Sequence, residues 1–252
     1  MTKPPDIICE IGLNHMGDPK YANRYLAALL PLRPFGITFM FREPEYYATR
    51  PGLTLPDRYY RQAARRIRRA GVKLGFSVSD PTRLALTKTL RADFYKLLSK
   101  DLTDPKLTVP LLKTGKLIYV STGLADLKEI GSFLKRAKRY RVPIVLNQTQ
   151  LTFDIGDSNL KAIETLRRKF KLPVSFGLHS ENPNVLYAAL SFAPAAMLFY
   201  VKGDRPITHK DERNAVPLSA CATIFTNLKE LSLAVGSGTK VKMHDQLHAN
   251  KK

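Results

Sequence analysis

The chain has 252 residues, of which 44% are hydrophobic and 25% charged, proportions typical of a folded globular protein that exclude wholesale disorder. Lys and Arg number 41 against 21 for Asp and Glu, which gives a net charge of +20. The two cysteines, Cys9 and Cys221, are too few and too far apart for a disulfide framework or a zinc site. No apolar run of about 20 residues would span a membrane, and residues 1–6 lack the apolar core of a signal peptide, so we expect a cytoplasmic protein.

Short apolar runs recur along the chain, and a helical pattern follows each one. The runs are apolar nearly throughout rather than alternating, as expected for parallel strands that are buried on both faces. The predicted strands are 7–12, 36–41, 73–79, 94–98, 117–122, 143–149, 173–180 and 196–202. Cys9 lies inside the first run, which predicts a buried free thiol.

The helices between these strands often begin where an acceptor side chain precedes a proline, as at Asp18-Pro19, Asp80-Pro81 and Asp104-Pro105. A proline costs nothing there, because the first turn of a helix has no partner for its N–H. The predicted helices are 18–30, 57–70, 81–90, 105–112, 125–140, 158–170, 184–192 and 217–235. Residues 42–56 form an irregular stretch, which we predict to be a long loop on the catalytic face.

Eight strand–helix units predict a single-domain (β/α)₈ TIM barrel, of α/β class, over residues 1–240. A doubly wound open sheet is the alternative, but it rarely uses eight regular repeats. The residues after the first strand, Gly12-Leu13-Asn14-His15, also fail to match the G-x-G-x-x-G dinucleotide fingerprint. Residues 241–252 are predicted to be a loose, basic tail.

Polar residues at the ends of the predicted strands are candidates for chemistry, because barrel enzymes place their sites there. Lys96 interrupts an apolar strand, so we expect its side chain to point into the barrel, where it would pair with Glu10, bind an anion or form a Schiff base. Ser99 and Ser121 suit either a phosphate or carboxylate site or ordinary helix capping. His179 is either a hydrogen-bonded core residue or a metal ligand.

Three segments resemble motifs of the N-acetylneuraminate (sialic acid) synthase family. Residues 9–18 (CEIGLNHMGD) are similar to the family's opening motif, residues 94–103 (FYKLLSKDLT) to its strand-four motif and residues 120–124 (VSTGL) to its strand-five motif. Order and spacing agree, and the resemblance extends from about residue 7 to residue 240. The bacterial members carry a C-terminal antifreeze-like domain, which we expect to be absent here.

Family members join phosphoenolpyruvate to the open-chain aldehyde of an N-acetylated hexosamine and release phosphate, with Mn²⁺ or Mg²⁺ holding the aldehyde oxygen. The resemblance therefore implies a set of catalytic, substrate-binding and metal-binding residues. The implied catalytic residues are Glu10 and Asp101, the substrate-binding ones Lys96, Ser99, Ser121 and Asp211, and the metal ligand His179. These types suit the chemistry, since a lysine and hydroxyls neutralise an anion and a metal stabilises a developing alkoxide.

The chain departs from the family at four of the positions that matter. The family's strand-two lysine and glutamine fall at Thr38 and Met40, and its second metal histidine and the acidic residue before it fall at Val201 and Phe199. A site with one histidine and an apolar residue opposite would bind metal weakly.

Three functions remain open on the sequence. The first is a phosphoenolpyruvate-dependent condensation with an amino-sugar aldehyde, and the alternative is a degenerate barrel that binds an anionic ligand or a partner protein without catalysis. The third, nucleic-acid binding through the arginine-rich helix at residues 61–69, ranks below both, because no nucleic-acid module is present and a charge run is usually a solvated face. No membrane partner is expected, and the oligomeric state stays open.

Overall fold

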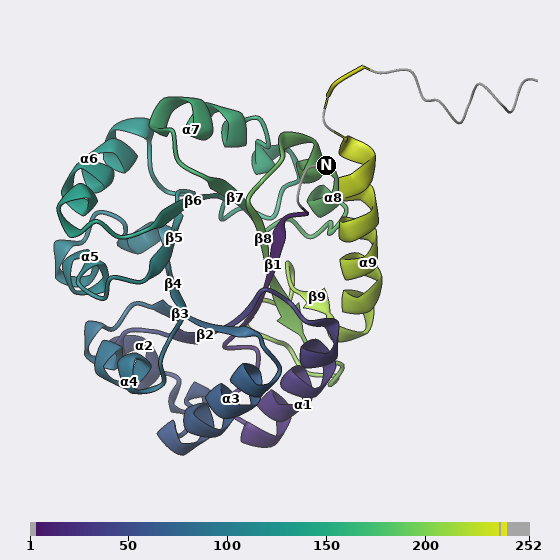
Figure 1. The fold of residues 1–252 in the computed structure, drawn as a ribbon. Coiled ribbons are helices and arrows are strands. Elements are labelled where there is room, and N and C mark those ends of the chain that lie inside the picture. Colours follow the sequence, from purple (N-terminus) through teal and green to yellow (C-terminus); the bar gives the residue numbers. More distant parts are fainter. Residues whose placement is uncertain (1–3, 237, 241–252) are drawn as a thin grey trace, which may run out of the picture.

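A computed structural model describes residues 4–236 and 238–240 as a closed barrel of parallel strands wrapped in helices (Figure 1). The strands pair in chain order, and β1 also pairs with β8, which closes the barrel. The predicted TIM barrel is therefore confirmed, whereas the predicted tail at 241–252 lies outside the described residues. The strands are β1 Asp6–Gly12, β2 Gly36–Phe41, β3 Lys73–Val78, β4 Phe94–Leu97, β5 Leu117–Ser121, β6 Ile144–Gln148, β7 Val174–Leu178 and β8 Ala196–Lys202.

The helices alternate with the strands and cover the outside of the barrel (Figure 1). Every predicted strand and helix is present, with ends displaced by at most a few residues. The α-helices are α1 Pro19–Leu29, α2 Pro44–Ala48, α3 Asp57–Arg69, α4 Leu84–Thr89, α5 Pro105–Leu112, α6 Leu127–Ala137, α7 Ala162–Phe170, α8 Val185–Ala189 and α9 Leu218–Val235. A short strand, β9 Val216–Pro217, adds to the end of β8.

Side-chain caps explain where several helices begin. The Asp18 carboxylate accepts from the Lys20 amide ahead of α1, and the Asp104 carboxylate accepts from the Lys106 amide ahead of α5, each at 2.8 Å. Asp80 caps a 3₁₀ turn, Pro81–Arg83, that leads into α4. These aspartates satisfy amide groups that a helix start otherwise leaves without partners.

The interior of the barrel is apolar near the amino ends of the strands and polar near their carboxyl ends. An apolar cluster that includes Phe94 fills the first part. Gly75 makes this possible, because a Cβ there would lie 2.3 Å from the Phe94 ring. The cluster consists of Ile8, Phe94, Tyr119, Val145, Ala196 and Leu198. This layer supports the polar residues above it.

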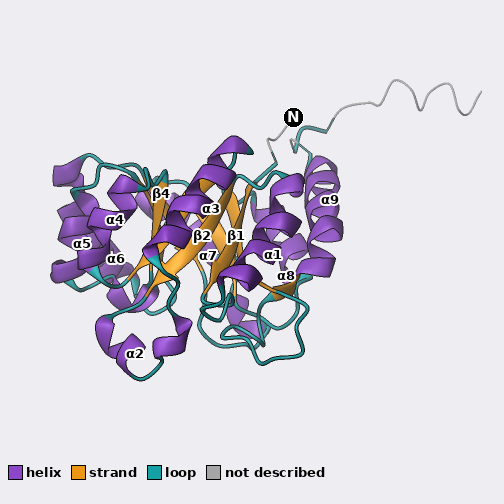
Figure 2. Cartoon of the chain, turned by 90° about the horizontal axis from the view of Figure 1, so that it is seen from below, coloured by secondary structure: helices purple, strands orange, loops and turns teal. Residues whose placement is uncertain are grey.

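The loops that leave the carboxyl ends of the strands gather on one face, the lower one in Figure 2, and the amino ends of the strands lie on the opposite side. The segment 42–56 belongs to that face, as predicted, but it contains α2 and a 3₁₀ turn, Pro51–Leu53. Both cysteines are buried free thiols, as predicted for Cys9. Within the part of the chain that the structure describes, no helix combines the length and apolarity needed to span a bilayer.

Candidate active site

A cavity of about 230 Å³ opens at the carboxyl ends of the strands. It is smaller than the roughly 300–1,000 Å³ of sites for drug-sized ligands, so it suits a small metabolite. Lys96, Ser99, Ser121, His179 and Asp211 all line it, which places most of the predicted site residues together. The rest of the lining is Leu13, Met40, Arg42, Tyr46, Leu98, Lys100, Thr149, Leu151, Tyr200 and Lys210.

Lys96 forms a closed ion pair with Glu10 beneath this cavity. Its ammonium lies 2.6 and 2.7 Å from the two carboxylate oxygens, and both side chains are at most 3% exposed. This pairing confirms one of the alternatives left open by the sequence. Lys96 lines the cavity, whereas Glu10 is not among the lining residues.

Thr38 stands beside Glu10 across the β1–β2 ladder. Its side chain is fully buried, and its hydroxyl has no hydrogen-bond partner among the described residues. A lysine at this position would therefore reach the same carboxylate as Lys96. With threonine there, Lys96 is the one cationic partner of Glu10 in the part of the chain that the structure describes.

The side chains of strand β8 are oriented differently from the prediction. Phe199 and Val201 face the helices, not the cavity, because both belong to the outer core and Phe199 contacts the ring of Phe225 on α9. The inward row of β8 carries Tyr200, whose ring lies under the Lys96 ammonium at 5.2 Å and lines the cavity. The interpretation that Val201 replaces the second metal histidine is thus wrong, and the residue facing His179 is Tyr200.

Gly12 makes room for Tyr200. Its backbone has a φ of +55°, and a Cβ there would lie 2.8 Å from the Tyr200 ring. Glycine adopts this left-handed conformation without strain and allows the close approach. The turn after β1 and the inward row of β8 are therefore matched to each other.

His179 lies edge-on to Tyr200, with 5.8 Å between ring centroids. Burial, and secondarily the charge of Lys96, lowers its pKa to about 3. The positive charge of Lys96 in the same cavity also opposes a cation. Among residues 4–236 and 238–240, no three His, Cys, Asp or Glu side chains are grouped so as to hold a metal ion. These donors do not fit the divalent-metal centre that the family resemblance implies.

The two serines present hydroxyl groups to the cavity. The Ser99 oxygen accepts from the Gly123 amide at 3.0 Å, and the Ser121 oxygen accepts from the Asn147 side-chain amide at 3.4 Å. Asn147 is itself oriented by Ser175, whose hydroxyl donates to its Oδ1 at 2.9 Å. Because each serine oxygen accepts from the protein, its own hydrogen remains available to an anion in the cavity.

Asp101 does not join the residues that line the cavity. It ends a 3₁₀ turn, Ser99–Asp101, and its carboxylate accepts from the Ser79 hydroxyl at 2.7 Å and the Lys100 ammonium at 2.8 Å. The carboxylate thus ties the ends of β3 and β4 together.

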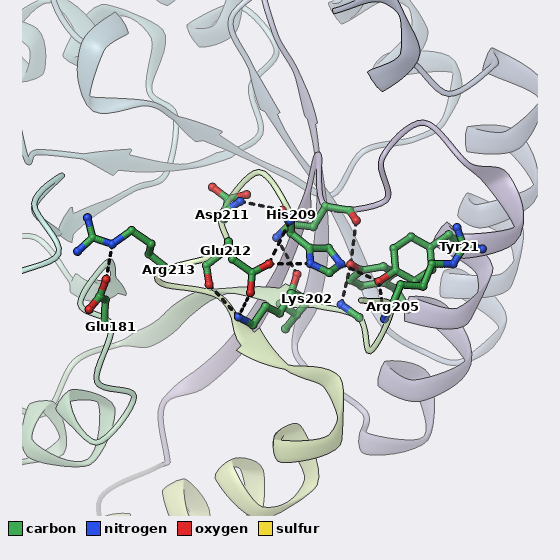
Figure 3. A network of polar contacts seen from close by, with 12 residues as sticks. Tyr21, Glu181, Lys202, Arg205, His209, Asp211, Glu212 and Arg213 are labelled. Atoms are coloured by element: carbon green, nitrogen blue, oxygen red, sulfur yellow. Dashed lines mark hydrogen bonds and ion pairs between the residues drawn. The ribbon is translucent and has the colours of Figure 1, made fainter. Parts of the chain in front are cut away.

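Asp211 enters the cavity from the loop between β8 and β9 (Figure 3). Its amide donates to the Asn14 side chain at 3.0 Å, and the Asn14 side-chain amide donates to the Val201 carbonyl at 2.9 Å. Burial, and then the charge of Glu10, raises the pKa of Asp211 to about 7. This carboxyl group can therefore exchange a proton near neutral pH.

A polar network anchors the same loop (Figure 3). His209 contacts the Tyr21 hydroxyl through Nε2 at 2.7 Å and the Glu212 carboxylate through Nδ1 at 2.9 Å. Lys202 forms an ion pair with Glu212, and Arg205 forms one with Asp18 at 2.8 Å. The network ties the loop to β8 and to the start of α1, which holds Asp211 in place.

Three further cations, which are not among the predicted site residues, also line the cavity. Arg42, Lys100 and Lys210 join Lys96, so that four basic residues face one carboxylate in the lining. The Arg42 guanidinium is held by two 2.9 Å hydrogen bonds to Glu43 and lies 4.1 Å from the centre of the Tyr46 ring. The excess of positive charge favours an anionic ligand.

The fold and this cavity define the chain as a TIM-barrel protein with a small, predominantly cationic site at the carboxyl ends of its strands. The chain belongs to the NeuB family, whose model matches residues 35–240. The family membership confirms the relationship to sialic acid synthases that the three motifs predicted.

Several known proteins are similar to this chain. An uncharacterized protein of Methanocaldococcus jannaschii is 25% identical and aligns over 96% of this chain and 75% of its own. The N,N'-diacetyllegionaminic acid synthase of Campylobacter jejuni is 24% identical over 62% of this chain and 48% of its own, and human N-acetylneuraminate-9-phosphate synthase is 20% identical over 99% and 76%. The crystal structure of an N-acetylneuraminic acid synthetase from Leptospira borgpetersenii, in complex with citrate, superposes with a TM-score of 0.90 at 20% identity, covering 98% of this chain and 90% of that one.

Proposed function

We propose that this chain condenses phosphoenolpyruvate with the aldehyde of an amino sugar and releases phosphate. One observation carries the proposal: Lys96, Ser99, Ser121 and Asp211, from β4, β5 and the loop after β8, line a single cationic cavity. Membership of the NeuB family and similarity to a legionaminic acid synthase support it.

The cavity supplies the groups that such a substrate requires. Lys96 would neutralise the phosphate or carboxylate of phosphoenolpyruvate, and the Ser99 and Ser121 hydroxyls would donate to the same oxygens. Glu10 would orient Lys96, and it would accept or return a proton when the lysine binds the phosphate or carboxylate of phosphoenolpyruvate. Asp101, which holds the β3 and β4 ends, would orient the lysine and serines from outside the cavity.

In the proposed reaction a C–C bond forms between C3 of phosphoenolpyruvate and the aldehyde carbon. Water adds at C2, phosphate leaves, and the aldehyde oxygen takes up a proton. Asp211 would supply that proton, and its place in the cavity lining and its pKa of about 7, which lets it carry a proton at neutral pH, support this role. Family synthases typically use a divalent metal, whereas the donors in this cavity do not form such a centre.

The test is phosphate release from phosphoenolpyruvate with N-acetylmannosamine and related amino sugars, with and without Mn²⁺. We expect release that depends on the sugar and is lost in Lys96→Ala. Lys135→Ala, on the exposed face of α6, is the matched control and should retain activity. If no sugar supports release, the condensation proposal is wrong.

A second candidate function is an anion-binding barrel without catalysis. Two features favour it. Lys96 is already paired with Glu10. In addition, the residue opposite His179 is Tyr200, which does not supply the second imidazole that the family's metal site has. In that case phosphoenolpyruvate would raise the thermal unfolding midpoint of the wild-type chain but not of Lys96→Ala, and no phosphate would appear. Turnover would exclude this second function.

A further inference from the structure

Helix α3 carries a row of arginines on the outside of the barrel. Tyr59, Tyr60, Ala63, Ala64 and Ile67 are buried against the barrel, so the opposite face of the helix is exposed to solvent. The exposed row is spaced by three or four residues and spans about 16 Å at 1.5 Å per residue. The row consists of Arg58, Arg61, Arg65 and Arg69.

These four guanidinium groups have no carboxylate partners among the described residues. The helix contains one acidic residue, Asp57, and Arg83 engages it at 2.6 Å. The other two arginines of α3 are also occupied, since Arg66 donates to the Asn23 side chain and Arg68 to the Leu90 carbonyl. Within residues 4–236 and 238–240, no ion pair joins the exposed row to an acid.

Neighbouring helices widen the basic surface. Arg24 is exposed on α1, next to the Asn23 that contacts Arg66, and Lys88 and Arg91 are exposed beside the Leu90 that contacts Arg68. In Figure 1, α3 lies between α1 and α4. We call the whole surface the arginine face, which consists of Arg24, Arg58, Arg61, Arg65, Arg69, Lys88 and Arg91.

We propose that the arginine face binds the phosphodiester backbone of a nucleic acid. Arginine presents a planar fork of donors that matches phosphate oxygens, which makes it the preferred residue for nucleic-acid contacts. Like charges three and four residues apart destabilise a helix, and a phosphate chain laid along the row would relieve that repulsion. A single linear row on one helix fits a strand of phosphates.

A lipid surface fits less well. The large hydrophobic side chains that are exposed among the described residues lie outside α1, α3 and α4, so the arginine face offers nothing to insert into a bilayer. Exposed aromatic rings for base stacking are also lacking there, because Tyr59 and Tyr60 are buried. Binding would therefore depend on phosphates and be independent of base sequence.

The arginine face is separate from the cavity. The row lies on the outward side of α3, whereas the cavity is lined by strand ends and their loops. Nucleic-acid binding and phosphate release therefore test different surfaces, and either can fail without the other.

The experiment is fluorescence anisotropy of the full chain with a labelled 20-nucleotide RNA and a 20-base-pair DNA of mixed sequence, from 50 to 200 mM salt. We expect binding whose affinity falls steeply with salt. Replacing Arg58, Arg61, Arg65 and Arg69 by Gln should weaken binding to the duplex at 50 mM salt at least tenfold and reduce the slope of log K against log salt by up to about 3.6, or 0.9 per lost contact.

The matched control removes four exposed charges elsewhere, with Lys135, Arg139, Arg168 and Lys169 replaced by Gln. This variant should keep the wild-type slope. Equal losses of nucleic-acid affinity in both variants would show that only net charge matters and would overturn the proposal. The proposal would also be overturned if the wild-type chain bound no nucleic acid, or if it bound phosphatidylserine vesicles but no nucleic acid. Arg61→Gln with Arg65→Gln, a double change on the same exposed row, repeats the test if the fourfold variant does not fold.

Discussion

The ammonium of Lys96 and the carboxylate of Glu10 meet at 2.6 and 2.7 Å inside the barrel, although 86 residues separate them in sequence. Of the two, Lys96 alone lines the cavity. Because the Glu10 carboxylate is paired with it, this carboxylate offsets part of the positive charge that Lys96 presents to a ligand. The pair therefore affects both the stability of the barrel and the charge of its cavity.

Removing one member of this pair should cost more than removing both. Lys96→Met leaves a buried, unpaired carboxylate, and we expect it to lower the free energy of unfolding by about 3–5 kcal/mol. Adding Glu10→Gln should restore part of that loss, because no buried charge then remains. Urea unfolding of the two single variants and the double variant measures the coupling. Purely additive losses would mean that the two charges are not paired.

Thr38→Lys should strengthen the binding of phosphoenolpyruvate. The new ammonium would lie beside Glu10 in the β1–β2 ladder and compensate its charge, which leaves Lys96 freer to bind the anion. Thr38→Met is the control, since it adds similar bulk without charge. Isothermal titration should show tighter binding in the lysine variant alone. An equal change in both variants would point to packing as the cause.

Tyr200→His should create a binding site for Mn²⁺. It would set a second imidazole opposite His179, whose ring centroid lies 5.8 Å from that of Tyr200. Val201→His is the control, because that side chain faces the helical layer. Titration followed by electron paramagnetic resonance should find bound Mn²⁺ only in the first variant. Tighter Mn²⁺ binding in the Val201 variant would contradict the inward orientation of Tyr200.

Phosphate release should fall as pH rises through about 7. Burial and Glu10 raise the pKa of Asp211 to about 7, so the carboxyl group loses the proton it would deliver above that pH. Its ordinary pKa is 3.8, and a raised folded-state value means that Asp211 contributes stability below about pH 4 that is lost as pH rises through 7. Asp211→Asn should lack both effects. Activity profiles and urea unfolding from pH 5 to 9 measure them, and identical profiles in the two proteins would refute the assignment.

Strands and helices were predictable because each carries a local signal. Continuous apolar runs indicate strands buried on both faces, and Asp18-Pro19 and Asp104-Pro105 begin helices where the structure places them. Similar local reasoning identified Lys96 as an inward-pointing side chain, because a charge in an apolar run needs a partner. The capping box of Asp126 with Glu129, which begins α6, is a local signal of the same kind.

The inward row of β8 was not predictable. Phe199, Tyr200 and Val201 are all buried, so hydrophobicity has no alternation that would show which face each occupies. Asp101 illustrates a second limit, because its partner Ser79 lies on another strand and its engagement depends on the barrel register. In both cases the deciding contact joins segments that are distant in sequence.

The barrel, the family and the polar residues at the strand ends could all be predicted without coordinates, since they follow from local apolar patterns and from contiguous motifs. The three-dimensional arrangement was needed to establish that Lys96 pairs with Glu10, that Tyr200 faces His179 and that Asp101 does not line the cavity. Closure of the sheet through the β1–β8 pairing sets these relationships, because it fixes which side chains of eight separate strands share the interior.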